Sequence, residues 1–314
     1  MAATSSVSVN KDHQAFATTN FSKSGASGLY DRARPSYPLP AYSQILDLLL
    51  PPSPSPSPGA TTPTGAHVVE LGSGTGLFTR GFLRAAAERA RGEGNPVRRV
   101  TAVEPSEGMR EGFERAMRKE EEAALKGEGE GGGGAEVVCV DGTFEKVPVG
   151  DGEADLVVIA QAWHWTGTTQ LPAAREVARV LRPGGAWCLI WNLEDRAVRW
   201  VAGMRDAYEK FESDTPQYRH GLWKAMYGEP EFHELFTEPT HAKFHRALPT
   251  TEDLAVERVF SKSYITALSD AERSELEHEL RENLRRGEDR VWIDEHKGVF
   301  EYPYETDLFV SRRR

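Results

Sequence analysis

Cysteine is scarce in this chain, which has two cysteines among its 314 residues. Cys139 and Cys188 each stand inside an apolar stretch, and neither has a cysteine or histidine at metal-ligand spacing. This pattern excludes a disulfide-stapled scaffold and a cysteine-based zinc site, so both residues are interpreted as small buried hydrophobic side chains. We expect a reducing, cytoplasmic setting.

Long hydrophobic runs and an excess of basic residues are also missing. The longest apolar stretches have the length of a β-strand, and the N-terminal stretch MAATSSVSVNKDHQAF lacks the apolar segment of a secretory signal. The net charge of −10 argues against a polyanionic partner, since nucleic-acid binders usually present a basic face. We therefore expect no nucleic acid and no membrane as partner, and a monomer or homodimer.

Three stretches lack the apolar periodicity of helices and strands. Residues 1–20 are polar and predicted to be a disordered tail, whereas 51–66 is rich in proline and 126–135 rich in glycine, as is typical of surface loops. The remainder, residues 21–314, is expected to form a single domain. Its predicted parts are an N-terminal cover and helix (21–50), a ligand-binding core (67–192), an insert (193–240) and C-terminal antiparallel strands and helices (241–314).

The segment VVELGSGTGLF, residues 68–78, carries a glycine turn between a strand and a helix. The strand ends in Glu70, and the glycines are Gly72, Gly74 and Gly76. Such a turn is typical of a nucleotide-type ligand site, because glycine allows φ > 0 and a close approach of the ligand to the main chain. A dinucleotide fingerprint needs a glycine where Leu77 stands, and a phosphate loop needs a Gly-Lys-Ser/Thr ending. An NAD-dependent oxidoreductase is therefore disfavoured, while a purely structural glycine turn stays open.

Strand-like and helical segments alternate along the core. Further apolar strands are expected at 97–105, 136–142, 154–165 and 186–192, with amphipathic helices between them. Buried strands that alternate with helices predict a parallel, doubly wound α/β sheet. Residues 300–310 form a last predicted strand, in which Pro303 indicates a bulge or an edge.

Three acidic residues, Glu70, Glu104 and Asp141, each stand at the carboxyl end of a successive predicted strand. Because these ends of parallel strands lie side by side, we expect the three side chains to converge on one crevice. A carboxylate after the second strand can accept hydrogen bonds from both ribose hydroxyls. An acid after the third strand can accept one from an adenine amine, so the set favours an adenosine-containing ligand.

Five segments resemble, in order, the motifs of class I S-adenosylmethionine-dependent methyltransferases of the methyltransferase-11 type. They are VVELGSGTGLFTR, AVEPSEGMR, VDGTFEKVP, ADLVVIAQAWHW and EVARVLRPGGAWCLIWN. The segment GLYDRARPSYP resembles the N-terminal cover of the trans-aconitate-methyltransferase-like members. The resemblance implies a Rossmann-like, seven-stranded, mostly parallel sheet with helices on both faces, an N-terminal cover, and a helical and aromatic insert after the fifth strand.

The resemblance also implies S-adenosyl-L-methionine as cofactor and assigns its contacts. Gly72, Gly74 and Gln161 would face the methionine part, with Glu70 organising the turn, Glu104 on the ribose, Met109 beside the adenine and Asp141 on the adenine amine. The other implied cofactor contacts are Ser73, Gly76, Pro105, Gly142 and Thr143. The sequence departs from the group after the fourth strand, where Thr166-Gly167 replaces the usual aromatic-Asp pair.

The methyl acceptor is expected beyond the fourth strand, between the WHW sequence, the N-terminal cover and the insert. The predicted substrate-binding residues are Tyr30, Arg34, Tyr37, Trp163 and Trp165. Alternation along an extended segment would place Trp163 and Trp165 on one side, where they exclude water, and His164 on the other. His164 is the candidate catalytic residue that orients or deprotonates the acceptor, with a purely structural role as the alternative.

These expectations predict methyl transfer to a small organic acceptor, by O-methylation of a carboxyl or hydroxyl group. Displacement from a sulfonium needs positioning more than a metal, and no metal site is expected because His241 and His245 merely alternate along a strand. A non-catalytic cofactor-binding regulator and a methyltransferase of a protein acceptor stay open as alternatives. Amino-methylating nucleic-acid enzymes are disfavoured, because Gln161-Ala162-Trp163-His164 replaces their Asp/Asn-Pro-Pro-aromatic run.

Overall fold

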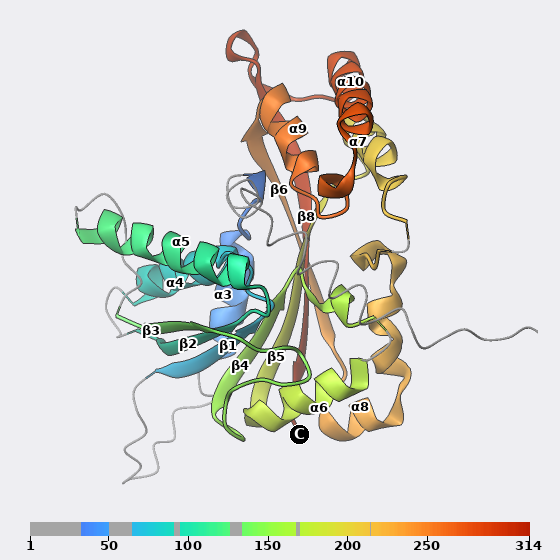
Figure 1. The fold of residues 1–314 in the computed structure, drawn as a ribbon. Helices are drawn as coiled ribbons and strands as arrows, with labels where there is room; N and C mark the ends of the chain where they lie inside the picture. The colour runs from blue at the N-terminus through green and yellow to red at the C-terminus, as the bar shows by residue number, and fades with distance from the viewer. Residues whose placement is uncertain (1–32, 50–64, 91–94, 126–133, 168–169, 214) are drawn as a thin grey trace, which may run out of the picture.

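The computed structural model describes residues 33–49, 65–90, 95–125, 134–167, 170–213 and 215–314, and its centre is one sheet (Figure 1). The strands are β1 (Ala66–Leu71), β2 (Val97–Val103), β3 (Glu136–Val140), β4 (Ala154–Ala160), β5 (Leu181–Glu194), β6 (Thr240–Thr250), β7 (Trp292–Asp294) and β8 (Val299–Arg312). Their order is β3-β2-β1-β4-β5-β8-β6, with the short β7 paired to β8 outside this path. The strands from β3 to β5 pair in parallel, and β8 pairs antiparallel with β5, β6 and β7.

This architecture confirms the predicted Rossmann-like, mostly parallel α/β fold. The sheet has eight strands where seven were expected, and the additional one is β7, which has three residues. The chain runs from β1 outward to β3 and then returns to the other side of β1 with β4. A ligand crevice forms at such a reversal, at the carboxyl ends of the strands, so the ends of β1 and β4 position the site.

Helices cover both faces of the sheet (Figure 1). On one face lie α3 (Leu39–Asp47), α4 (Leu77–Arg89) and α5 (Glu107–Leu125). The spacing of leucine and phenylalanine in α4 gives the helix one apolar side. Phe78, Phe82 and Leu83 on that side are buried against the strands. On the other face lie α6 (Gln170–Val180) and α8 (Pro230–Leu235), with the short 3₁₀ helices η1 (Trp163–Thr166), η2 (Tyr218–His220) and η3 (Leu222–Gly228).

A third group of helices packs around the far end of β6 and β8, beyond the parallel strands (Figure 1). It comprises α7 (Arg199–Glu209), α9 (Glu252–Phe260) and α10 (Asp270–Arg286), with the short 3₁₀ helices η4 (Ile265–Ala267) and η5 (Glu295–Lys297) nearby in sequence. Leu276, Leu280 and Leu284 of α10 are buried, and a capping box of Ser269 and Glu272 begins the helix. This helical group has its own apolar core and covers the carboxyl end of β5.

Of two local expectations, the first is wrong and the second is correct. The strand predicted for 154–165 ends at Ala160, and Trp163–Thr166 is a 3₁₀ helix, because Gln161 takes the left-handed conformation with φ 59° and turns the chain. Pro303 marks a local edge, as expected, because β8 pairs there with β6 on one side while β5 has ended on the other. Pro303 immediately precedes Tyr304, whose pairing with Glu194 is the last between β8 and β5. The N–H group that proline lacks would therefore have had no partner in β5.

No helix among the described residues combines the length and the apolar character needed to cross a membrane. Tyr30 and residues 1–32 lie outside the described residues, as do most of the predicted proline-rich and glycine-rich loops. The expected division into a tail and one domain stays a prediction.

Candidate functional site

The three glycines of the β1–α4 turn have different roles. All three have positive φ, with 70° at Gly72, 55° at Gly74 and 78° at Gly76. A Cβ on Gly72 would lie 2.7 Å from the Cβ of Ala162, and one on Gly76 would lie 2.7 Å from the ring of Phe113. A Cβ on Gly74 would meet nothing within 4 Å. Gly72 and Gly76 therefore permit close packing, whereas Gly74 keeps backbone open to a ligand.

Two buried carboxyl groups flank this turn. Glu104 accepts hydrogen bonds from the N–H groups of Gly74 and Ser106, both at 2.9 Å, and Glu70 accepts one from the hydroxyl of Thr79. Burial raises the pKa of Glu70 to about 8, against the opposing effect of the Thr79 hydrogen bond. Burial also raises the pKa of Glu104, partly offset by the N–H groups of Ser106 and Gly74. Glu70 thus holds the turn to α4, and Glu104 links the turn to the end of β2.

The third predicted acid is placed differently. The Asp141 side chain is 76% exposed and pairs with Arg110 at 3.1 Å, so it does not join Glu70 and Glu104 in one buried cluster. Arg110 also donates to the carbonyls of Glu104 and Pro105, which follow β2. Because Asp141 follows β3, Arg110 connects the ends of the two strands. Glu70 and Glu104 therefore lie together beside the glycine turn, and the convergence of all three acids on one crevice stays a prediction.

Three other predicted cofactor contacts near β3 have evident packing roles. A Cβ on Gly142 would lie 2.7 Å from the Val103 side chain, and Thr143 forms a β-bridge with Lys146. Met109 is buried in α5. These three residues therefore have roles within the fold itself. Their contacts with a cofactor stay predictions.

A first pocket lies at the reversal between β1 and β4. It is lined by Arg34, Pro35, Tyr37, Glu70, Gly72, Ser73, Gly74, Leu77, Phe78, Ala160, Gln161 and Arg258. The structure therefore brings together seven of the predicted site residues, namely Arg34, Tyr37, Glu70, Gly72, Ser73, Gly74 and Gln161. The lining does not include Gly76, Glu104, Pro105, Met109, Asp141, Gly142 or Thr143, although Glu104 contacts Gly74 directly.

Sequence reasoning missed five residues of the first pocket: Pro35, Leu77, Phe78, Ala160 and Arg258. Four of them lie within two residues of predicted positions in the sequence, so a wider window around the motifs would have found them. Arg258 belongs to α9 and adjoins no motif, so nothing in the sequence indicates that it reaches the glycine turn.

The first pocket fits a ligand with polar groups. The hydroxyl of Ser73 is buried and has no hydrogen-bond partner of good geometry among the described residues, and Gly74 leaves space beside it. A buried polar atom of this kind is costly unless a ligand or water satisfies it. Ser73, Gly74 and the nearby Glu104 could thus hold the polar part of a nucleoside cofactor.

Gln161 is the hinge between β4 and η1. Its left-handed backbone is unusual for a residue with a side chain and costs about 1–2 kcal/mol. Two hydrogen bonds at 2.8 Å hold it in place, from its N–H to the Ile190 carbonyl and from its side-chain amide to the Asn192 carbonyl. Strained backbone held by its surroundings is common at ligand sites, and Gln161 lines the first pocket.

The described part of the N-terminal cover lies over the first pocket. Arg34 donates from Nε to the hydroxyl of Ser261 at 3.0 Å, which ties the cover to the end of α9. Tyr37 is 5% exposed and packs edge-on against Tyr42 and Phe78. Tyr37 is thus largely a core residue that contributes to the wall of the first pocket, in place of the substrate contact expected of it.

The WHW sequence does not form the expected wall of an acceptor site. Trp163 is fully buried, and its ring lies 5.0 Å from that of Trp187 and 5.9 Å from that of Phe144. Trp165 is half-buried and packs against the same apolar core. A 3₁₀ helix has no two-residue alternation, so the tryptophans do not share a ligand-facing side, and the predicted substrate contact of Trp163 is wrong.

His164 has the properties of a neutral structural histidine. Burial lowers its pKa to about 3, with further contributions from the charges of Arg34 and His220. The indole N–H of Trp191 donates to its Nδ1 at 3.3 Å, which places the ring proton on Nε2. His164 is absent from the lining of the first pocket and of the second pocket described next. These features favour the structural alternative over the general base.

A second pocket lies beside the first, under the third helical group. It is lined by Arg34, Gln161, Asn192, Leu193, Glu194, Arg205, Tyr208, Glu209, Glu212, Gln217, Tyr218, Arg219, Arg258, Lys262 and Tyr264. Arg34, Gln161 and Arg258 line both pockets, so the two adjoin at these side chains. The predicted insert, residues 193–240, supplies most of this wall, including Tyr208 and Tyr218, whereas its Trp223, Phe232 and Phe236 are buried in the core.

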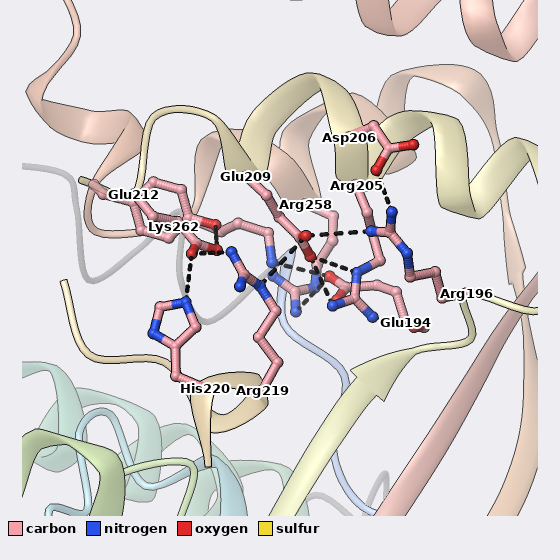
Figure 2. Close-up of polar contacts among 11 residues, drawn as sticks. Glu194, Arg196, Arg205, Asp206, Glu209, Glu212, Arg219, His220, Arg258 and Lys262 are labelled. Atoms are coloured by element: carbon pink, nitrogen blue, oxygen red, sulfur yellow. Dashed lines mark hydrogen bonds and ion pairs between the residues drawn. The ribbon is translucent and has the colours of Figure 1, made fainter. Parts of the chain in front are cut away.

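Charged side chains dominate the second pocket (Figure 2). Glu194 pairs with Arg258 at 3.0 Å and with Lys262 at 3.1 Å. Glu209 pairs with Arg205 at 2.6 Å and with Arg219 at 3.3 Å. Burial alone would raise the pKa of Glu194, but the cations around it, Lys262 first, hold that pKa well below its usual range, so the group is ionised.

One further cluster could hold a metal ion among the described residues. Ligand atoms of Asp195, His245 and Glu305 lie within 4.8 Å of one another, but His245 is exposed and Lys243 already donates to Glu305 at 2.8 Å. A cation in the cluster opposes metal binding, so the sequence expectation of no metal site stays a prediction. His241 pairs with Asp307 at 2.6 Å.

The comparisons with known proteins agree with this geometry. A family model described as a methyltransferase domain matches residues 69–189, the segment that holds the glycine turn and the strands from β1 to β4. An uncharacterized methyltransferase of Mycobacterium tuberculosis is 32% identical over 176 residues, covering 56% of this chain and 54% of that protein. This chain thus matches about half the length of the mycobacterial relatives.

Two further relatives extend the similarity. An uncharacterized methyltransferase-like protein of Schizosaccharomyces pombe is 26% identical over 257 residues, covering 81% of this chain and 82% of that protein. A solved structure of a protein provisionally assigned as a type II methyltransferase, from Anaeromyxobacter dehalogenans, aligns with a TM-score of 0.52 and 18% identity over 89% of this chain and 97% of its own. The solved structure supports the fold alone.

The glycine turn, the sheet reversal and the family match lead to one identification. The cofactor predicted from the sequence, S-adenosyl-L-methionine, is the methyl donor that a domain of this kind uses. Residues 69–189 thus match a methyltransferase domain, and they lie in a chain with the Rossmann-like α/β fold.

Proposed function

We propose that the protein transfers a methyl group from S-adenosylmethionine to a small organic acceptor held in the second pocket. The observation that carries the proposal is the contact between the two pockets, which share Arg34, Gln161 and Arg258. One pocket adjoins the glycine turn of the methyltransferase domain, and the other is enclosed by the C-terminal helices. A donor and an acceptor in adjoining pockets can react by in-line displacement, which depends chiefly on their relative position.

The bound cofactor supplies a methyl group already activated by its sulfonium, and the chain supplies orientation. Ser73 and Gly74 would hold the cofactor through the buried hydroxyl and the open backbone, with Glu104 accepting hydrogen bonds from its ribose. Gln161 fixes the turn at the boundary of the pockets through its bond to Asn192. The cover, fastened by Arg34 to Ser261, excludes water from that boundary.

We propose an oxygen of a carboxyl or hydroxyl group as the atom methylated. A carboxylate is ionised at neutral pH and needs no general base, which agrees with the half-buried, neutral His164. Membership of the trans-aconitate-methyltransferase-like group, a cytoplasmic location and a monomeric or homodimeric state belong to the same proposal.

Two experiments test the proposal in sequence. Titration calorimetry with S-adenosylhomocysteine and with NAD should show binding of the former only, and failure of the wild type to bind S-adenosylhomocysteine would refute it. Transfer of a labelled methyl group is then measured with a panel of organic acids and alcohols. Label that enters only protein would support the protein-acceptor alternative, and binding with no transfer to any acceptor would support the non-catalytic regulator.

A further inference from the structure

Asn192 is a polar residue at the end of the apolar run of β5. The three residues before it, Leu189, Ile190 and Trp191, have buried apolar side chains, and Asn192 itself is only 4% exposed. A buried amide is costly unless its hydrogen-bonding groups find partners. The partners of this side chain therefore indicate why asparagine occupies this position.

The Asn192 side chain connects the sheet to the N-terminal cover. Its Nδ2 group donates to the carbonyl of Ser36 at 2.8 Å and to that of Pro35 at 3.2 Å. Its Oδ1 atom accepts from the hydroxyl of Thr306, the paired residue of β8, at 2.6 Å. Because the Thr306 hydroxyl donates to Oδ1, the side of the amide that carries the donors is directed toward the cover.

The part of the cover that Asn192 holds has no regular secondary structure. Residues 35–38 lie in neither a helix nor a strand, so no ladder of main-chain hydrogen bonds fixes the carbonyls of Pro35 and Ser36. The Ser36 carbonyl also accepts from Arg246 of β6, and the Pro35 carbonyl accepts from Asn192. Side-chain donors of the sheet therefore determine where this part of the cover lies.

The main-chain carbonyl of Asn192 holds a second wall of the two pockets. It accepts from the side-chain amide of Gln161 at 2.8 Å. Pro35 and Gln161 line the first pocket, and Gln161 and Asn192 line the second. A single residue thus contacts both the cover and the turn after β4 at the place where the pockets adjoin.

We propose that Asn192 is a positioning residue, which keeps the cover and Gln161 in the arrangement that retains the bound cofactor beside the second pocket. This inference rests on the proposed function and adds the residue on which the geometry of the boundary depends. Asn192 acts through Pro35 and Gln161 and takes no part in the chemical step. Loss of its hydrogen bonds should loosen both walls, which affects the rate at which a ligand leaves more than the rate at which it enters.

The test measures how fast S-adenosylhomocysteine leaves the full-length protein. Asn192→Asp keeps the size of the side chain but replaces its two donors with a carboxylate oxygen that faces two carbonyls. We expect unlabelled ligand to displace bound, radiolabelled S-adenosylhomocysteine about tenfold faster than from wild type. Hydrogen–deuterium exchange at the amides of Ser36 and Tyr37 should also become faster.

Asn283→Asp is the matched control. The side chain of Asn283 donates to the carbonyl of Trp200 at 2.6 Å in the third helical group, and it lines neither pocket. The control variant loses the same kind of hydrogen bond as Asn192→Asp. Its melting temperature should fall, while S-adenosylhomocysteine dissociates at the wild-type rate.

Two variants of Thr306 separate the orientation of the Asn192 amide from the stability of the sheet. Thr306→Val keeps the volume but removes the hydroxyl that donates to Asn192, so dissociation should become severalfold faster. Thr306→Ser keeps the hydroxyl and deletes one methyl group from a buried site, so it should be less stable than wild type and yet retain the wild-type dissociation rate. A merely structural role of Asn192 would give no such difference between the two variants.

Three results would overturn the inference. If Asn192→Asp and Thr306→Val release S-adenosylhomocysteine at the wild-type rate, Asn192 positions neither wall, while the proposed function still holds because the wild type binds the ligand. If Asn283→Asp releases it as fast as Asn192→Asp, the effect is a general loss of stability. If the wild type does not bind S-adenosylhomocysteine, the proposed function fails and this inference fails with it.

Discussion

Alanine substitutions at Gly74 and Gly76 should separate ligand binding from folding. Both glycines are left-handed, so alanine costs about 1–2 kcal/mol of backbone strain at either position. At Gly74 the new Cβ meets no atom within 4 Å, whereas at Gly76 it meets the Phe113 ring at 2.7 Å. Overpacking of this kind adds about 1–3 kcal/mol at Gly76 only.

These energies predict different melting temperatures. At roughly 2–4 °C per kcal/mol, Gly74→Ala should lower the melting temperature by about 2–8 °C and Gly76→Ala by about 4–20 °C. Affinity should change in the opposite order. The Gly74 methyl group enters the first pocket and should weaken S-adenosylhomocysteine binding by at least tenfold, while Gly76→Ala, measured well below its melting temperature, should bind within about threefold of wild type.

Differential scanning fluorimetry and titration calorimetry measure the two quantities on the same samples. A Gly74→Ala variant that binds S-adenosylhomocysteine like wild type would show that the ligand does not approach this backbone. Equal losses of affinity in both variants would show that the turn acts as one unit, and the distinction between open and packed glycines would be refuted.

Three further predictions concern titratable side chains. Glu104→Gln removes the charge that would face the ribose, so calorimetry should show about ten- to a hundredfold weaker binding of S-adenosylhomocysteine, and an unchanged affinity would contradict that role. Glu70 has a folded-state pKa of about 8, above its ordinary value, so its contribution to stability is complete at low pH and is lost as pH rises to about 8. The free energy of unfolding of Glu70→Gln, measured with urea, should therefore rise relative to that of wild type by up to roughly 4 kcal/mol between pH 5 and pH 9. If the free energies of the two proteins change in parallel with pH, Glu70 does not carry a buried proton. His164→Asn should reduce methyl transfer less than tenfold with no change in the pH–rate profile, because His164 is already neutral, whereas a hundredfold loss with an altered profile would restore the general base.

The sequence predicts the parts of the fold that local chemistry determines. The glycine turn after β1 follows from three glycines between a strand and an amphipathic helix, and the start of α10 follows from Ser269 and Glu272. The end of β4 could not be predicted in this way. The run ADLVVIAQAWHW is apolar throughout, and periodicity does not distinguish a strand that continues from one that turns at Gln161.

The residues that line the second pocket also could not be predicted from the sequence. Aromatic residues suit both cores and pockets, so the sequence does not distinguish Tyr208 and Tyr218 of the insert, which line the second pocket, from Trp223 and Phe232, which are buried. Arg258 and Glu194 are far apart in the chain and meet only because α9 packs across the end of β5. A pairing of this kind depends on tertiary structure, and nothing in either local segment encodes it.

The unequal lengths of β5 and β8 have a mechanical consequence. Pairing between them ends at Glu194 and Tyr304, while β6 and β8 continue together as far as Thr250 and Phe300. Beyond Tyr304 the wide sheet narrows to a ribbon that carries the third helical group, and a narrow ribbon bends and twists more easily than a wide sheet. We therefore expect the molecule to open by rotation about this point, which would carry Arg258 away from the glycine turn and admit both reactants without unfolding either part.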